Sequence, residues 1–165
     1  MGLPQSVMDR VEFHPIEDVI LPILRDGLPG VGVYSEIPEE GLGAFVEGET
    51  LPLVIVRRHT EQGVWHGDPR FLDSGALMIH TFTEDPDGDQ DGAYLSEAVR
   101  TVLRDAWLSK TTVPGVGSVS SIRLYEPPRR VTDWATASGP VQFADLPTGV
   151  WRYETVYSIK VRPIL

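Results

Sequence analysis

The stretch from residue 95 to residue 107 constrains the fold most, because its apolar residues recur with the period of an α-helix. They fall at i, i+3, i+4, i+7, i+8, i+11 and i+12, namely Leu95, Ala98, Val99, Val102, Leu103, Ala106 and Trp107. Polar residues such as Glu97, Arg100 and Arg104 occupy the opposite side. The pattern predicts an amphipathic helix of about four to five turns whose apolar face lies on a sheet.

The segment 151–163, WRYETVYSIKVRP, shows the other clear period, a strict alternation of residue types. One set is mainly apolar and aromatic: Trp151, Tyr153, Thr155, Tyr157, Ile159 and Val161. The other set is mostly charged and includes Arg152, Glu154 and Lys160. Alternation of this kind predicts an antiparallel strand with one face on the core and one face in water.

Five further segments carry weaker patterns. Residues 15–30 predict a first helix with one apolar stripe, and Pro22 is expected to kink it or to shift its start. Strands are predicted over 31–38, 51–59, 71–83 and 117–126. The β-branched run within 51–59 is typical of a strand that is buried on both faces.

The order of these elements, α-β-β-β-α-β-β, contains no repeated strand–helix–strand unit. We therefore expect an α+β fold, a single domain over 1–165 with an antiparallel or mixed sheet and two helices packed on one face. Residues 127–149 contain several prolines and little periodicity, so we expect an extended loop excursion there.

Composition excludes several classes of protein. The chain has no cysteine, which rules out disulfide scaffolds, thiolate metal sites and cysteine nucleophiles. Its 24 acidic and 14 basic residues give a net charge of −10, which argues against a surface that grips DNA or RNA. It contains no apolar run of about 18 residues, so no membrane span is predicted.

The loop 85–92, DPDGDQDG, begins like a calcium-binding EF-hand loop. Asp87, Asp89 and Asp91 alternate before Gly92, but the ninth and twelfth loop positions are Leu95 and Ala98, which cannot bind a hard cation. The favoured interpretation is that Asp89 or Asp91 caps the following helix and that the negative charges complement its positive end. A weak calcium site made by the three aspartates stays an alternative.

No other motif predicts an enzyme or a cofactor site. The four histidines are scattered without metal-ligand spacing, and no G-x-S-x-G nucleophile turn occurs. We therefore name no catalytic residue, no metal ligand beyond the weak aspartate candidates and no cofactor.

Aromatic residues in predicted loops, together with arginine pairs, suggest contacts between proteins, because tryptophan and arginine are enriched at such interfaces. Packing of these side chains onto their own domain is the alternative. The interface candidates are Arg57, Arg58, Trp65, Arg129, Arg130, Trp134 and Phe143.

Several segments, in their order along the chain, resemble the tail terminator proteins of long-tailed bacteriophages, especially those that infect actinobacteria. They are 19-VILPILRDGLPGVGVYSEIP-38, 52-PLVIVRR-58, 71-FLDSGALMIHTF-82, 91-DGAYLSEAVRTVLRDAW-107 and 151-WRYETVYSIKVRP-163. The resemblance implies an α+β fold with two helices on one face of a sheet, in agreement with the patterns above.

The resemblance also implies a function. Such proteins form a ring, commonly hexameric, at the head-proximal end of the tail tube, where they stop tube polymerisation and offer a surface to the head connector. The implied partners are other copies of the chain, the tube protein and neck proteins, and DNA passes through the lumen without specific binding. The implied location is the virion, after assembly in the host cytoplasm. Another head–tail connector or tail completion protein, or a small calcium-binding module built on 85–92, are the alternatives.

Overall fold

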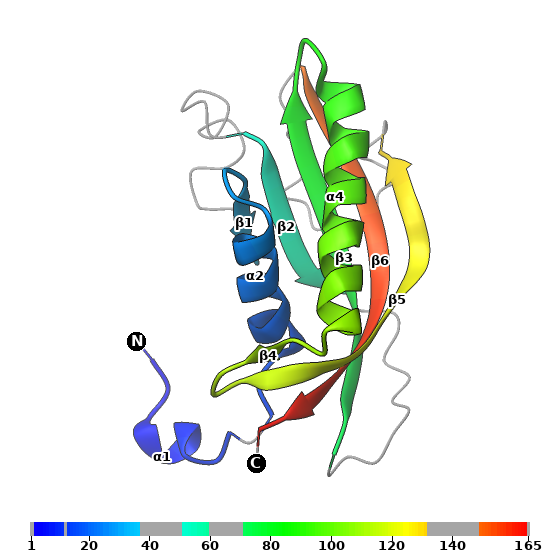
Figure 1. Ribbon diagram of the computed structural model, residues 1–165. Coiled ribbons are helices and arrows are strands. Elements are labelled where there is room, and N and C mark those ends of the chain that lie inside the picture. The colour runs from blue at the N-terminus through cyan, green and yellow to red at the C-terminus, as the bar shows by residue number, and fades with distance from the viewer. Residues whose placement is uncertain (1, 12, 37–50, 60–70, 132–148, 165) are drawn as a thin grey trace.

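The structure, a computed structural model, describes residues 2–11, 13–36, 51–59, 71–131 and 149–164. Within these ranges, one curled six-stranded mixed sheet carries two helices on one face, and a short third helix lies near the N-terminus (Figure 1). The expected α+β class, with two helices on one face of a sheet, is confirmed.

The order of elements differs from the expected one by a short helix and a short strand. The helices are α1 (Gln5–Met8), α2 (Ile16–Gly27) and α4 (Gly88–Leu108). The strands are β1 (Gly32–Tyr34), β2 (Leu53–Arg58), β3 (Asp73–Glu84), β4 (Thr112–Val113), β5 (Gly117–Arg130) and β6 (Val150–Pro163). Neither α1 nor β4 was expected, because four and two residues are too few to show a period.

The sheet has the strand order β1-β2-β3-β6-β5-β4. β1 runs parallel to β2, and every other neighbouring pair is antiparallel, so the sheet is mixed. The central pair, β3 and β6, stays in register from Asp73 opposite Val161 to Glu84 opposite Val150. The strand predicted at 151–163 is therefore one of the two central strands of the sheet.

The main core lies between the sheet and the two long helices. α2 contributes Ile20 and Leu24, α4 contributes Val99 and Leu103, and Ile159 of β6 lies beneath them. The first helix begins at Ile16 and continues through Pro22 to Gly27, so the expected shift of its start is wrong. Pro22 cannot donate a backbone hydrogen bond, which destabilises the helix. Burial of the apolar face of α2 offsets this loss of stability.

Part of the second face of the sheet, the face away from α2 and α4, is also buried, which the sequence did not predict for β6. The run Leu53, Val54, Ile55 and Val56 is fully buried, so the expectation of a two-sided strand over 51–59 is confirmed. Arg152 and Glu154, however, were expected in water and are only 1% and 2% exposed. The wet face expected for residues 152–156 is therefore wrong.

β5 continues past the point where the sequence predicted its end. Pro127 and Pro128 cannot donate backbone hydrogen bonds, and the register with β6 shifts between Glu126 and Arg129. After this irregularity the pairing resumes, with Arg129 opposite Glu154. Residues 127–130 thus belong to the sheet, and 132–148 of the expected excursion lie outside the described residues.

α4 lies unusually close to β6 at its first two turns, where glycines face the sheet. A Cβ atom on Gly88 would lie 2.2 Å from Cδ1 of Trp151, and one on Gly92 would lie 2.8 Å from Cδ2 of Tyr153. One turn further on, a hydrogen bond of 3.1 Å joins the hydroxyl groups of Ser96 and of Thr81 in β3. Small residues therefore set the distance between helix and sheet.

We predict that Gly92→Ala lowers the free energy of unfolding by about 1–3 kcal/mol, because the added methyl group forces Tyr153 or the helix to move. The gain in helix propensity, at most about 1 kcal/mol, offsets only part of this loss. Chemical denaturation measures the change. Gln90→Ala, on the exposed side of the same turn, is the matched control, and equal stability of the two variants would contradict the close-packing explanation.

Candidate assembly surfaces

The two arginines at the end of β2 have different surroundings. Arg58 makes a two-point ion pair with Glu17 of α2, in which Nε and Nη2 each lie 3.1 Å from a carboxylate oxygen. Arg57 is directed by strand alternation to the second face, where burial lowers the pKa of its guanidinium and the charge of Glu36 opposes the change. Arg58 therefore fastens β2 to α2, although its side chain remains 61% exposed.

The three candidate aspartates do not converge on one point. Asp87 precedes α4 without a capping hydrogen bond from its side chain, and Asp89 and Asp91 lie in the first helical turn. Asp89 accepts hydrogen bonds from Oη of Tyr153 at 2.7 Å and from Nη1 of Arg130 at 3.0 Å. The expected capping by Asp89 or Asp91 is therefore wrong, while their position suits the positive end of the helix.

Arg129 and Arg130, which were expected at an interface, are tied into the sheet. Arg130 pairs with Asp89 and its guanidinium lies 5.4 Å from the ring centre of Trp151. Arg129 donates to the carboxylate of Glu154. Both arginines remain about half exposed, so each can serve its own domain and still border a contact surface.

Glu154, which accepts the hydrogen bond from Arg129, belongs to a buried charged cluster on the second face of the sheet. The other buried members are Arg152 and His80. Nδ1 of His80 lies 3.7 Å from a carboxylate oxygen of Glu154. Burial, and then the charges of Arg152 and Arg57, lower the pKa of His80 to about 3. The imidazole is therefore neutral at neutral pH, and its approach to Glu154 is not an ion pair.

The remaining interface candidates, Trp65, Trp134 and Phe143, lie outside the described residues. Their role stays a prediction from the sequence.

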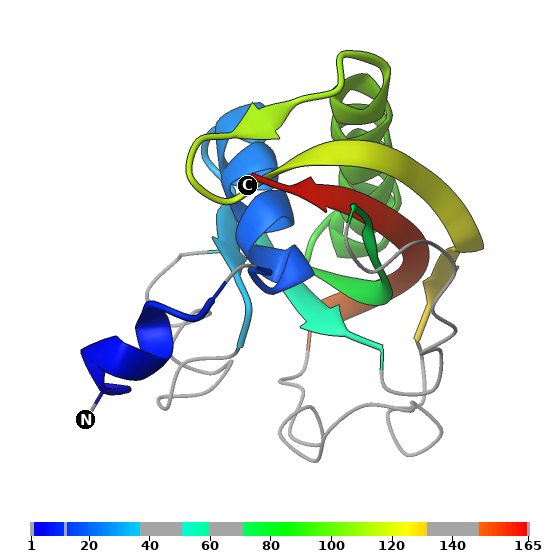
Figure 2. The same ribbon diagram turned by 90° about the horizontal axis from the view of Figure 1, so that it is seen from below.

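The N-terminal arm, residues 2–13, is a surface that the sequence patterns did not single out. Its described residues are all exposed, and α1 buries no side chain. Its large apolar residues and their exposed fractions are Leu3 (68%), Val7 (45%), Met8 (45%), Val11 (38%) and Phe13 (40%). The arm extends from the body beside the start of α2 (Figure 2). A four-residue helix is not stable alone in water, so these exposed apolar side chains make the arm a candidate contact surface.

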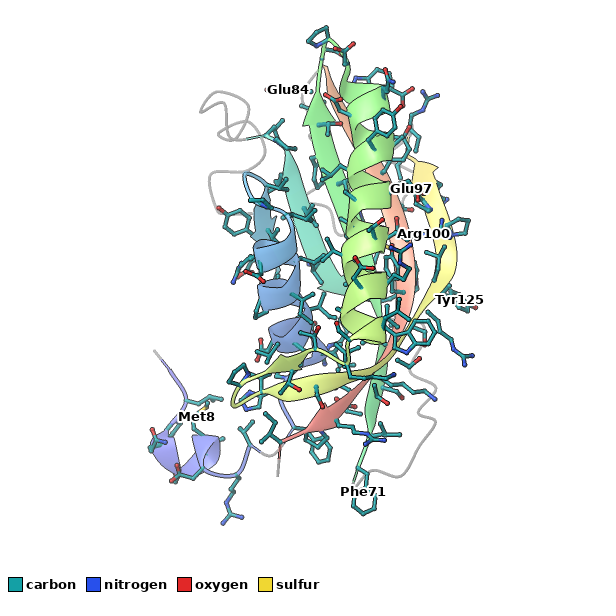
Figure 3. The ribbon with its side chains drawn as sticks, in the orientation of Figure 1. Met8, Phe71, Glu84, Glu97, Arg100 and Tyr125 are labelled. Atoms are coloured by element: carbon teal, nitrogen blue, oxygen red, sulfur yellow. The ribbon has the colours of Figure 1, made fainter. Side chains whose placement is uncertain are left out.

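An acidic cleft of about 430 Å³ lies where β3 ends and α4 begins, at the end of the molecule away from the arm (Figure 3). Its lining residues are Leu51, Pro52, Thr83, Glu84, Asp85, Pro86, Asp91 and Leu95. Asp85 accepts a hydrogen bond of 2.7 Å from Nε1 of Trp151. The side-chain carboxylates of Glu84 and Asp91 have no hydrogen-bond or ion-pair partner in the part of the chain that the structure describes. Figure 3 shows Glu84 and Met8 at opposite ends of the molecule.

The outer edge of β5 is a third surface. Among the described residues, β4 pairs with it only at Gly117 and Ser118. Nζ of Lys110 donates to the carbonyl oxygen of Ser120 at 2.8 Å, and three register irregularities follow along the strand. Bulges, prolines and basic side chains are features that discourage unspecific pairing of an open edge. We therefore regard this edge as less suited to assembly than the arm and the cleft.

A sequence signal for the arm exists, but it is short. Leu3, Val7 and Val11 follow at steps of four residues, which is the spacing of one helix face, although α1 covers only Gln5–Met8 and so includes only Val7. No pattern could have predicted the cleft, because its walls come from the segment before β2, the turn after β3 and the first turns of α4.

Two general findings limit the chemistry of these surfaces. No group of three or more histidine, aspartate or glutamate side chains within the described ranges is arranged to hold a metal ion. None of the helices described here is both long and apolar enough to cross a membrane.

No protein-family model matches the chain, and no curated protein matches it.

We predict that His80→Gln weakens the dependence of stability on pH between 6.5 and about 3. In this window the unfolded chain binds a proton at His80 that the folded chain does not, so stability falls as the pH is lowered, by up to about 1.4 kcal/mol per pH unit. Denaturation at several pH values in the window measures the slope.

The matched control for this variant is His14→Gln, since His14 lies near the surface beside Asp18. An unchanged slope in His80→Gln would contradict the neutral buried imidazole.

Proposed function

We propose that this chain is a structural protein of the virion of a long-tailed bacteriophage, a tail terminator. In this proposal it forms a hexameric ring at the head-proximal end of the tail tube, stops addition of further tube subunits and offers a joining surface to the neck proteins. DNA passes through the ring without specific binding, consistent with the net charge of −10.

The observation that carries the proposal is the exposed apolar arm. A chain that acts alone gains nothing from five large apolar side chains in water, whereas a subunit of an assembly can bury them against a neighbour. The arm and the cleft are unlike surfaces at different ends of one domain (Figure 3). Unlike surfaces make a head-to-tail contact, and such contacts close into rings when the rotation between subunits permits.

The segments that resemble tail terminators add support because they form most of the two long helices and of the strands on which these helices pack. They contain most of α2, all of β1 and β2, nearly all of β3, most of α4 and nearly all of β6. These elements include the helix layer and four of the strands. The helices and strands that lie wholly outside these segments are α1, β4 and β5.

The alternatives have less support. Another head–tail connector or tail completion protein would also use the exposed arm and shares the proposed location. A calcium module would need Asp87, Asp89 and Asp91 to converge, and both oxygens of Asp89 already accept hydrogen bonds from Tyr153 and Arg130. Neither alternative accounts for the arm better than a ring does.

We predict that co-production of this chain with the tube subunit of its own virus yields short tubes that carry a ring on one end. Tubes made without the chain should continue to lengthen. Negative-stain electron microscopy measures tube length and shows the ends. An identical length distribution with and without the chain, and bare tube ends, would contradict a terminator.

Two variants of the arm provide the control for this assay. Val7→Asp places a charge in the apolar stripe and should abolish the ring while leaving the unfolding temperature unchanged, since α1 buries no side chain in its own domain. Ser6→Asp introduces the same charge into the same helix at an exposed polar position and should retain the ring.

A further inference from the structure

A group of positive charges lies on the second face of the sheet, where the last residues of β6 run beside β5. Side chains of β6 alternate between the two faces, and Ile159 enters the main core, so Lys160 and Arg162 lie on the other face. Arg123 of β5 stands opposite Ser158 and shares that face. Arg123 and Arg162 are exposed, and Lys160 is half-buried. We call Arg123, Lys160 and Arg162 the basic patch.

The charges of the basic patch are not neutralised by the residues that the structure describes. None of the three side chains has a hydrogen-bond or ion-pair partner in that part of the chain. Glu126 lies further along β5 on the same face, opposite Val156, and no ion pair joins it to Arg123. Like charges at neighbouring positions on a sheet face repel each other. The patch therefore suits a partner surface that carries negative charge.

The acidic cleft offers charges of the opposite sign. The side-chain carboxylates of Glu84 and Asp91 lack partners among the described residues, and Asp87 is exposed in the chain between them. Three carboxylates therefore match the three cations of the basic patch in number and in sign. The volume of about 430 Å³ admits the ends of long basic side chains, and the apolar walls of Leu51 and Leu95 suit their methylene groups.

The basic patch and the acidic cleft of one chain cannot meet. Lys160 stands opposite Ser74, and the ten residue steps of β3 from Ser74 to Glu84 span about 33 Å. Figure 1 shows the end of β6 and the turn between β3 and α4 at opposite ends of the sheet. A contact between patch and cleft therefore joins two molecules, and because the two surfaces differ, it is a head-to-tail contact.

Duplex DNA is the other polyanion to which a basic patch could bind. Three cations support only weak binding of DNA that is sensitive to salt, and the net charge of −10 repels DNA from the chain as a whole. A second copy of the chain carries a surface with the matching number of charges and with apolar walls. The observations therefore favour a second copy.

We propose that the basic patch of one copy of this chain binds the acidic cleft of a second copy. Lys160 and Arg162 face the carboxylates of Glu84 and Asp91, and Arg123 lies at the rim of the contact. This inference rests on the proposed function and deepens it, because it identifies a head-to-tail contact that joins neighbouring subunits of the ring.

The chain has two lysines, Lys110 and Lys160, which allows a test with the unaltered protein. Isotopically light and heavy full-length chains are mixed and treated with a carbodiimide, which condenses an amine with a carboxylate that it touches. Mass spectrometry of the digest should find Lys160 joined to Glu84 or Asp91, in pairs that combine a light and a heavy chain.

Lys110 is the internal control for this experiment. It is also exposed, but it lies at the outer edge of β5, where it donates to the carbonyl oxygen of Ser120. Lys110 should form linkages to Glu84 or Asp91 at least about tenfold less often than Lys160 does. Absence of the Lys160 linkages, or equal amounts from both lysines, would overturn the proposal.

Charge reversal tests the contact independently. Arg123→Glu with Arg162→Glu should lower the assembled fraction, measured as native mass at a fixed concentration, about tenfold or more, because the contact becomes repulsive. The unfolding temperature should not change, since neither side chain has a partner among the described residues. Adding Glu84→Lys and Asp91→Lys to the same chain exchanges the signs of patch and cleft and should restore assembly.

Arg100→Glu with Arg104→Glu is the control with the same change of charge, on the outer face of α4, and should assemble like the unchanged chain. Normal assembly of the Arg123 and Arg162 variant, or no recovery when the cleft is reversed as well, would overturn the proposal. If that variant assembles normally but no longer binds a short DNA duplex, the phosphate backbone is the partner of the patch and the proposal is overturned.

Failure of this inference can be told apart from failure of the proposed function. Rings that cap tubes in electron micrographs, without linkage of Lys160 to the cleft, would refute this contact and leave the terminator function intact. Efficient linkage in a protein that forms only open chains of subunits would support the contact and refute the closed ring.

Discussion

The register between β3 and β6 is the constraint on which the rest of the structure depends. On the helix side, Leu77 stands opposite Tyr157 and both enter the main core. On the other side, His80 stands opposite Glu154 in the buried charged cluster. A slip of one residue would exchange these faces, placing charges under the helices, so both faces of the sheet specify the same alignment.

The position of α4 follows from that register. Tyr153 and Trp151 project from the helix side of β6 to where Gly92 and Gly88 leave room for them. Asp89, in the same turn, then joins the helix to Tyr153 and to Arg130 of β5. The helix, the two strands and the turn after β3 are thus fixed together, and this turn forms one wall of the acidic cleft.

The elements with a strong period could be predicted from the sequence, and those without one could not. The apolar period at 95–107 identified α4, and the alternation at 151–163 identified β6. The same alternation suggested a wet face, because a charged strand face is usually solvated; burial of Arg152 and Glu154 depends on surroundings that no local pattern records. Pro127 and Pro128 similarly suggested an end to β5, although an irregular register carries the strand past them.

For the candidate site, residue type was a weaker guide than position. Arg58 and Arg130 were expected at an interface, yet each makes an ion pair within the domain. The apolar residues of the arm are individually ordinary, and their significance comes from exposure, which only the fold reveals. The cleft likewise exists only after three separate segments come together.

The measurement that tests the proposed ring most directly is the native mass of the purified chain, taken in chelator and again with calcium. The proposal predicts one species of about 110 kDa in both buffers, which is six times the chain mass of 18.3 kDa. A monomer of 18.3 kDa that takes up calcium would contradict it and would favour the calcium-binding alternative.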